Sequence, residues 1–367
     1  MAQESVIELL DKLDYDAGVK KRFIKKINGG LYESHQSFLS TPLLAILMLL
    51  IFEQNANIPD KMHLFYGKAF ETLFHKHDAF KEQYDRARRS NLQIDEFEKV
   101  FSVFCLRTYV KQKFEFSTSE LTKAVRESIK FERHETNPQD FMFDIEESVC
   151  LIMKEGASYF FIHRSFQEYF TALFLANCPE SVRDDFISNL SSRYGDGVLT
   201  MLFDMASDQI EPSWVTSNCD NYLREVGHGK NYTPLQARWS SVGFVQSKDV
   251  LILATLTPGP LAEFTSIMER FYPTLVNRDP IKFGEIEEYV REHESDFDFH
   301  WKEETSNDNN LLADIQEVRL DRLPAHFLEE IGITEYCERQ FNAIVELRNS
   351  INVDQVVKNK FLSDLLG

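Results

Sequence analysis

Basic residues are scarce relative to acidic ones in this sequence of 367 residues. Lys and Arg number 40 against 59 Asp and Glu, so the formal net charge is −19. Binding to nucleic acid or to an anionic membrane needs clustered Lys and Arg, so the charge argues against either as the main partner. Hydrophobic residues make up 43% of the chain, which is enough for packed cores, and the length predicts two or three domains.

Cysteines are few, and no two of them form a CxxC pair. The five are odd in number and widely spaced: Cys105, Cys150, Cys178, Cys219 and Cys337. This pattern argues against a disulfide framework or a zinc site and is typical of reduced thiols in a cytoplasmic protein. The most apolar run, residues 43–52, is about half of the ~20 residues that a membrane span requires. We therefore expect a buried helix there, and neither a membrane segment nor a signal peptide.

The chain contains no GxxxxGK[ST] loop, which a nucleotide hydrolase uses to hold phosphates. Its Gly-Lys pairs, Gly67-Lys68 and Gly229-Lys230, lack both the upstream Gly and the following Ser or Thr. Hydrolysis by this chain alone is therefore excluded, and no Ser/His/Asp or Cys/His spacing suggests another hydrolase. His75 and His77 point to different sides of a helix, so we expect no metal site.

Residues 159–176, YFFIHRSFQEYFTALFLA, are the most informative stretch of the chain. The first four are aromatic or β-branched and predict a short strand, and the apolar residues that follow recur with helical spacing. Ser165 and Glu168 have the spacing of a capping box, which predicts a helix from about residue 166 with His163 just outside it. That end of a helix favours an anion, so His163 either bonds an anion or turns away toward a neighbouring loop.

The segments before this stretch predict helices and then a β-hairpin. We expect helices over residues 63–80, 95–109 and 120–130, a strand over 113–116, a further short segment over 144–150, and two strands over 150–154 and 159–163. Glu155-Gly156-Ala157 joins the last two strands as a turn. Three helices followed by a hairpin is the winged-helix arrangement.

Winged helices often bind DNA, which makes a transcription regulator with a helical partner-binding domain the alternative function. The second helix of the helix-turn-helix, residues 119–130, carries three basic residues, Lys123, Arg126 and Lys130, but also Glu120 and Glu127. Its charge is nearly balanced, so we interpret it as a helix that packs on protein.

Residues 161–176 resemble the end of the winged-helix domain in NACHT-type nucleotide-binding proteins. These STAND-class signalling NTPases include the animal NLR immune receptors and bacterial antiphage proteins. Their motif is an apolar pair, His, a basic or polar residue, Ser or Thr, and Phe-Gln-Glu-Phe or Phe-Gln-Glu-Tyr. The resemblance implies that His163 touches the β-phosphate of bound ADP and holds the protein closed. It also implies that Pro42, in a small-Pro-Leu-Leu setting, packs against the adenine; without the family, Pro42 is simply a proline at the first helical position after Thr41.

The resemblance covers about residues 14–175 and implies a mainly α chain. We expect the end of a NACHT helical domain over residues 1–57, a winged-helix domain with a β-hairpin wing over 58–178, and a helical extension over 179–230. Residues 231–367 would form a mainly helical C-terminal sensor or interaction region. Whether Met1 is the true start or an internal one is left open.

Such a chain would be the C-terminal, regulatory part of a signalling NTPase in antiphage or innate immune defence. It lacks the P-loop core, which would be supplied in cis or in trans, and ADP or ATP would bind only together with that core. A protein trigger would act on the C-terminal region, and activation would involve oligomerisation. The isolated chain is expected to bind no cofactor.

Several features outside the motif lead to further expectations. Residues 4–27 have helical spacing, and Asn28-Gly29-Gly30 ends that segment. Residues 250–256 are either a helix or a buried strand. Residues 333–366 predict a helix with a break near Val353. The tail weakly resembles HEPN nucleases, but Val353 stands where their histidine would be. Of the tryptophans, we expect Trp301 to be an exposed partner anchor and Trp214 and Trp239 to be core residues.

Overall fold

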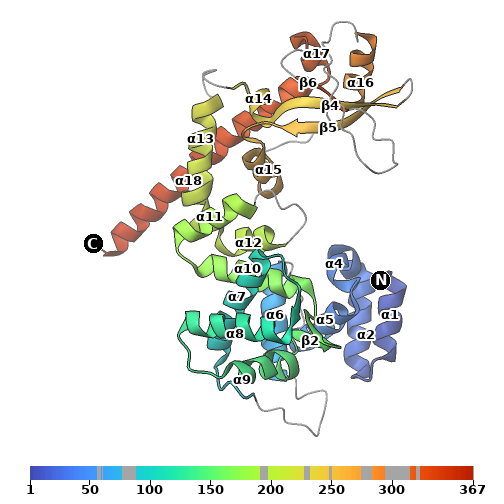
Figure 1. The fold of residues 1–367 in the computed structure, drawn as a ribbon, viewed down its shortest axis with the longest axis vertical. Coiled ribbons are helices and arrows are strands. Elements are labelled where there is room, and N and C mark those ends of the chain that lie inside the picture. Colours follow the sequence, from blue (N-terminus) through green and yellow to red (C-terminus); the bar gives the residue numbers. More distant parts are fainter. Residues whose placement is uncertain are drawn as a thin grey trace. The chain divides into compact units, whose positions relative to one another are not determined.

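A computed structural model describes residues 1–55, 59, 61–76, 88–190, 197–226, 232–247, 250–273, 283–293, 315–319 and 323–366. The chain is mainly helical, as predicted, and carries two three-stranded antiparallel sheets (Figure 1). It divides into two compact units, Met1–Arg183 with Gly195–Ala206, and Asp184–Tyr194 with Ser207–Gly367. Among the described helices, none is both long and apolar enough to cross a bilayer.

The first unit begins with short helices. These are α1 (Gln3–Lys12), α2 (Ala17–Lys26), the π-helical turn η1 (Ile27–Leu31), α3 (Tyr32–Ser34), α4 (Gln36–Leu39) and α5 (Pro42–Asn55). Residues 4–27 are helical as expected, and they form two helices. Asp16 accepts a hydrogen bond from the Val19 amide at 2.7 Å and so starts a second helix. Gly30, with φ of +106°, supplies the expected backbone break, and α5 starts at Pro42 as predicted.

The rest of the first unit combines helices with the first sheet. In chain order the elements are α6 (Met62–Lys76), α7 (Ile94–Val110), β1 (Glu115–Ser117), α8 (Thr118–Glu132), α9 (Pro138–Phe143), the π-helical turn η3 (Asp144–Ser148), β2 (Ile152–Glu155), β3 (Ser158–Phe161) and α10 (Arg164–Asn177). The sheet order is β1-β3-β2, and Gly156, with φ of +61°, makes the predicted turn between β2 and β3. Ser117 and Glu120 form a reciprocal capping box that starts α8.

Aromatic rings fill the core between α7 and α10. The rings of Phe101 and Phe170 meet edge to face with their centroids 4.8 Å apart, and Phe97 packs on Phe141 of α9 at 4.7 Å. Such pairs contribute beyond the apolar area that they bury. Helix α10 is therefore held along its length by α7, and this packing positions the residues at its start.

The second unit contains the other sheet. Two helices are divided between the units: α11 (Glu180–Leu190) after Arg183, and α12 (Val198–Ile210) after Ala206. The elements that follow them are η4 (Glu211–Val215), α13 (Thr216–Val226), α14 (Pro234–Arg238), β4 (Trp239–Ser247), β5 (Val250–Pro258), α15 (Ala262–Phe271), α16 (Phe283–Glu292), β6 (Ile315–Arg319), α17 (Ala325–Glu330) and α18 (Ile333–Leu366). The sheet order is β5-β4-β6. Residues 250–256 therefore lie in a strand, and the expectation of a mainly helical C-terminal region missed β4 and β6.

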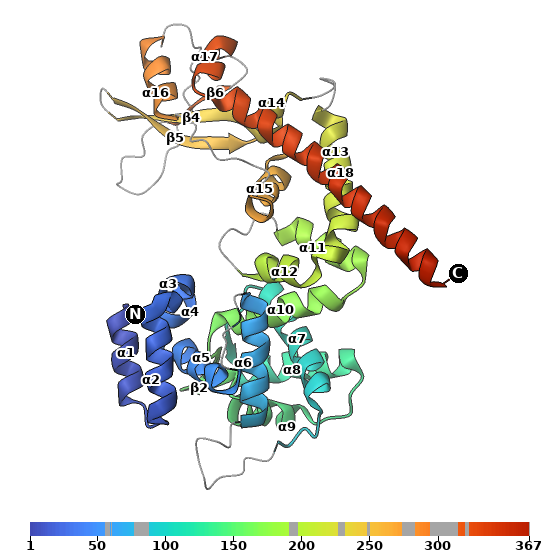
Figure 2. The same ribbon diagram turned by 180° about the vertical axis from the view of Figure 1, so that it is seen from behind.

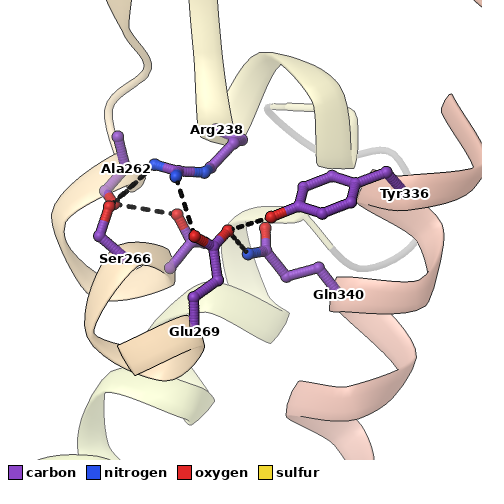
Figure 3. Close-up of polar contacts among 7 residues, drawn as sticks. Arg238, Ala262, Ser266, Glu269, Tyr336 and Gln340 are labelled. Atoms are coloured by element: carbon purple, nitrogen blue, oxygen red, sulfur yellow. Dashed lines mark hydrogen bonds and ion pairs between the residues drawn. The ribbon is translucent and has the colours of Figure 1, made fainter. Parts of the chain in front are cut away.

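Helix α18 runs unbroken through residue 353, where a break was expected. Within the second unit it lies against α13 and α14 (Figure 2). A polar network joins it to α15 and to the end of α14 (Figure 3). At its centre Glu269 accepts from Arg238 Nη2 at 3.3 Å, from Gln340 Nε2 at 2.8 Å and from the Tyr336 hydroxyl. Arg238 also donates to Ser266 Oγ at 2.9 Å.

Candidate functional site

His163 is the N-cap residue of α10. Its backbone is extended, with φ of −156° and ψ of 136°, and its Nδ1 accepts from the Ser165 amide at 3.3 Å. The Ser165 hydroxyl lies 2.5 Å from the same nitrogen. The predicted capping box between Ser165 and Glu168 is therefore wrong, because the imidazole takes the capping position and Ser165 lies inside the first turn.

These contacts define the tautomer of the His163 ring. An amide N–H can only donate, so Nδ1 must be unprotonated, and the proton of the neutral ring is on Nε2. Burial lowers the pKa of His163 below its ordinary value, which favours this neutral form. The ring thus caps α10 with one nitrogen, and its Nε2–H is a donor that the cap does not use.

Glu168 does not reach back to the start of the helix. Its carboxylate lies 3.1 Å from Arg164 Nε, and it accepts from the Gly197 amide at 3.2 Å. The Arg164 guanidinium in turn lies over the Phe114 ring, 4.6 Å from its centroid. Glu168 therefore joins α10 to the residue before α12, and it holds the cation next to His163.

Gln167 and Phe166, the other residues of the motif, anchor α10 to its neighbours. Gln167 is fully buried and donates to Thr108 Oγ1 at 2.9 Å and to the Lys113 carbonyl at 3.1 Å. The Phe166 ring packs on Tyr66 of α6, with their centroids 5.2 Å apart. The Phe-Gln-Glu triplet thus fixes where His163 stands. This role of Gln167 was not predicted, although a Gln between two aromatic core positions was a signal for it.

Pro42 is exposed at the first position of α5, and the Thr41 carbonyl accepts from the Ala45 amide at 3.0 Å. Four residues earlier, Phe38 packs on Tyr66 at 5.6 Å, so a chain of rings connects this part of the chain to Phe166. No recorded contact between described residues joins Pro42 to His163. The proline ring is exposed to solvent and is free to pack against a planar group.

The other candidates have simpler environments. Trp214 and Trp239 are buried, as expected, whereas Trp301 lies outside the described residues, as does His77. In the parts of the chain that the structure describes, no three His, Cys, Asp or Glu side chains cluster as metal ligands. All five cysteines are outside disulfides.

Taken together, the start of α10 offers one neutral imidazole donor for an anion. Neither a family model nor a curated protein matches this chain. The resemblance to NACHT proteins rests on the sequence motif around His163.

Proposed function

We propose that this chain is the nucleotide-sensing, autoinhibitory part of a NACHT-type signalling NTPase in antiphage or innate immune defence. It works with a P-loop core supplied in cis or in trans, and a protein trigger acts on residues 231–367. The observation that carries the proposal is the geometry of His163, whose Nδ1 is used by the helix cap while Nε2–H remains a donor. A donor fixed in this way can bind a β-phosphate oxygen without disturbing α10.

The order of elements in the first unit supports a winged-helix assignment for residues 58–178. A strand between two helices pairs with the second strand of a later hairpin, in the order β1-β3-β2, and the hairpin would be the wing. Helix α10 follows the wing directly, so His163 stands at the junction between the wing and the next helix. A phosphate contact there would connect the nucleotide to the position of the whole domain.

The same topology is the observation in favour of DNA binding, the alternative function. In that arrangement the helix just before the hairpin would enter the groove. Residues 138–148, which form α9 and η3, carry three partly exposed acidic residues, Asp140, Glu146 and Glu147, and no Lys or Arg, while Asp144 is buried. Phosphates would be repelled by the three partly exposed carboxylates. We therefore expect no duplex DNA binding in a gel-shift titration at low salt, and none that depends on Lys123, Arg126 and Lys130.

The proposal is tested by ADP binding to the chain reconstituted with its nucleotide-binding core. His163→Asn keeps a capping acceptor but lacks the distal donor, whereas His163→Ala loses both. A hydrogen bond to a charged group contributes about 1.5–3 kcal/mol, so both variants should bind ADP roughly tenfold or more weakly. Basal signalling should rise in both, because the closed state is lost.

Thermal unfolding separates binding from folding. Only His163→Ala should also destabilise the chain, by about 0.5–2 kcal/mol for a lost cap. If His163→Asn binds ADP as tightly as the unaltered chain does, the phosphate role is wrong and His163 is only a helix cap.

A further inference from the structure

A cavity of about 420 Å³ lies between α7, α8 and the C-terminal half of α10. Phe174 and Cys178 line it, near the opposite end of α10 from His163. A helix rises 1.5 Å per residue, so the two ends of α10 lie roughly 20 Å apart. The cavity is therefore separate from the proposed phosphate contact, and its volume is typical of small-molecule sites.

One wall of the cavity is aromatic. The rings of Phe131, in the last turn of α8, and Phe174 lie 6.1 Å apart at 56° to each other, next to Leu173. Phe131 is 58% exposed, an unusual position for a side chain of this size. The two ring faces can cover an apolar ligand body, and they attract cations through their quadrupoles.

Polar side chains of α7 also line the cavity. Ser102 is only 4% exposed, yet its hydroxyl has no hydrogen-bond partner. One turn earlier, the half-buried carboxylate of Glu98 has no recorded ion pair, and Glu132 of α8 adds a second carboxylate to the lining. The two carboxylates therefore offer negative charge to a ligand in the cavity.

The charged neighbours of Glu98 are already paired with one another. Asp95 lies 3.6 Å from Lys99, which is the cation among the lining residues, and Glu71 lies 2.7 Å from Lys68. Glu71 and Asp95 raise the pKa of Glu98 in addition to its burial, which is the larger cause. A bound cation would offset both the cost of burying the Glu98 carboxylate and its repulsion by the neighbouring carboxylates.

We propose that this cavity binds a small organic cation with an aromatic or aliphatic body. The body packs against the rings of Phe131 and Phe174, and the ammonium group faces Glu98 and Glu132. This inference does not depend on the nucleotide-sensing role.

The test is a titration of the full chain with three probes that share one ring, by isothermal calorimetry and saturation-transfer NMR. Phenethylammonium should bind at one site, roughly tenfold more tightly than neutral 2-phenylethanol, and phenylacetate should not bind. Glu98→Gln should remove most of the preference for the ammonium over the alcohol. Phe131→Ala should weaken binding of both the ammonium and the alcohol, and because Phe131 is exposed, this change leaves the packed core intact.

Glu135→Gln is the matched control, because it removes the same charge from an exposed loop residue that does not line the cavity. It should bind all probes as the unaltered chain does. The proposal is overturned if phenethylammonium shows no saturable binding at millimolar concentration, if phenylacetate binds as well as the ammonium, or if Glu98→Gln keeps the full preference. Binding of a peptide with adjacent Phe and Lys, but not of phenethylammonium, would replace the free amine with a protein segment.

Discussion

Glu269 is predicted to be the residue on which the packing of α15 against α18 depends most. Its carboxylate accepts from Arg238, Tyr336 and Gln340, so it joins α14, α15 and α18. The side chains of Arg238 and Glu269 are only 14% and 15% exposed, so this pair is not a solvated surface ion pair. Gln340 is fully buried. Removing Glu269 would leave a guanidinium, a phenol and an amide without their shared acceptor.

The size of the effect follows from that burial. Breaking a buried ion pair by removing one partner costs about 3–5 kcal/mol, because the other charge stays behind uncompensated. Glu269→Ala should therefore destabilise the second unit by about that amount, and Glu269→Gln, which keeps one acceptor, by less. Replacing both partners, as Arg238→Met with Glu269→Leu, should recover much of the loss, since no buried charge remains.

Tryptophan fluorescence during urea unfolding measures the stability of the second unit selectively. The three tryptophans all follow residue 207, and Trp239 stacks on Tyr336 with ring centroids 5.8 Å apart. Glu263→Ala, an exposed position on the same helix, is the control and should stay within about 0.5 kcal/mol. A loss below about 1 kcal/mol for Glu269→Ala, the value of a surface pair, would refute the reasoning. The reasoning would also be refuted if the double variant lost as much stability as the two single variants lose in sum.

Three further predictions concern the first unit and the thiols. Burial lowers the pKa of His163 in the folded state below its value of about 6.5 in the unfolded chain. As the pH drops below 6.5, the unfolded chain therefore binds a proton on this ring more readily than the folded chain does. Stability should fall as the pH drops from 6.5 toward that lower pKa, and less so in His163→Asn, as followed by urea midpoints. Gln167→Leu should cost about 1–3 kcal/mol in circular-dichroism melts, because the Lys113 carbonyl loses its donor; an unchanged midpoint would contradict this. Ellman's reagent should modify Cys150 and Cys178 quickly in the native protein. The buried thiols Cys105, Cys219 and Cys337 have raised pKa values, about 12 for the last two, and fast reaction of more than two thiols would count against this assignment.

Local signals in the sequence were sufficient for the elements around α10. The switch from strand to helical spacing, the Gly156 turn and the proline at the start of α5 each depend on a few neighbouring residues, and each is confirmed. The second sheet could not be found in this way. Strand β4 pairs with β6 through Ser241 and Arg319, which are far apart in the chain, and no local pattern encodes such a pairing.

The site itself was predicted only in part, for a chemical reason. The position of His163 before the helix was correct, but Ser165 was chosen as the cap because hydroxyls are the commoner capping acceptors. An imidazole can do the same with Nδ1, and nothing in the sequence distinguishes the two. The partners of Gln167 lie 54 and 59 residues away, so they too required the fold.

The double use of the His163 ring has a consequence for the proposed role. A cationic imidazole would attract a phosphate more strongly, but protonated Nδ1 would face the Ser165 amide as a second donor and the cap would be lost. Burial avoids this by favouring the neutral ring. In the proposed closed state the ring therefore contributes one directed hydrogen bond and no charge, so its contact is weaker than that of an ion pair and easier to break. A contact of that strength suits a closed state that nucleotide exchange must open, because the coupling between ligand and conformation need be only a few kcal/mol. In the proposed closed state α10, anchored by Phe166, Gln167 and Glu168, is the rigid part. The part that moves is the surface that carries the phosphate.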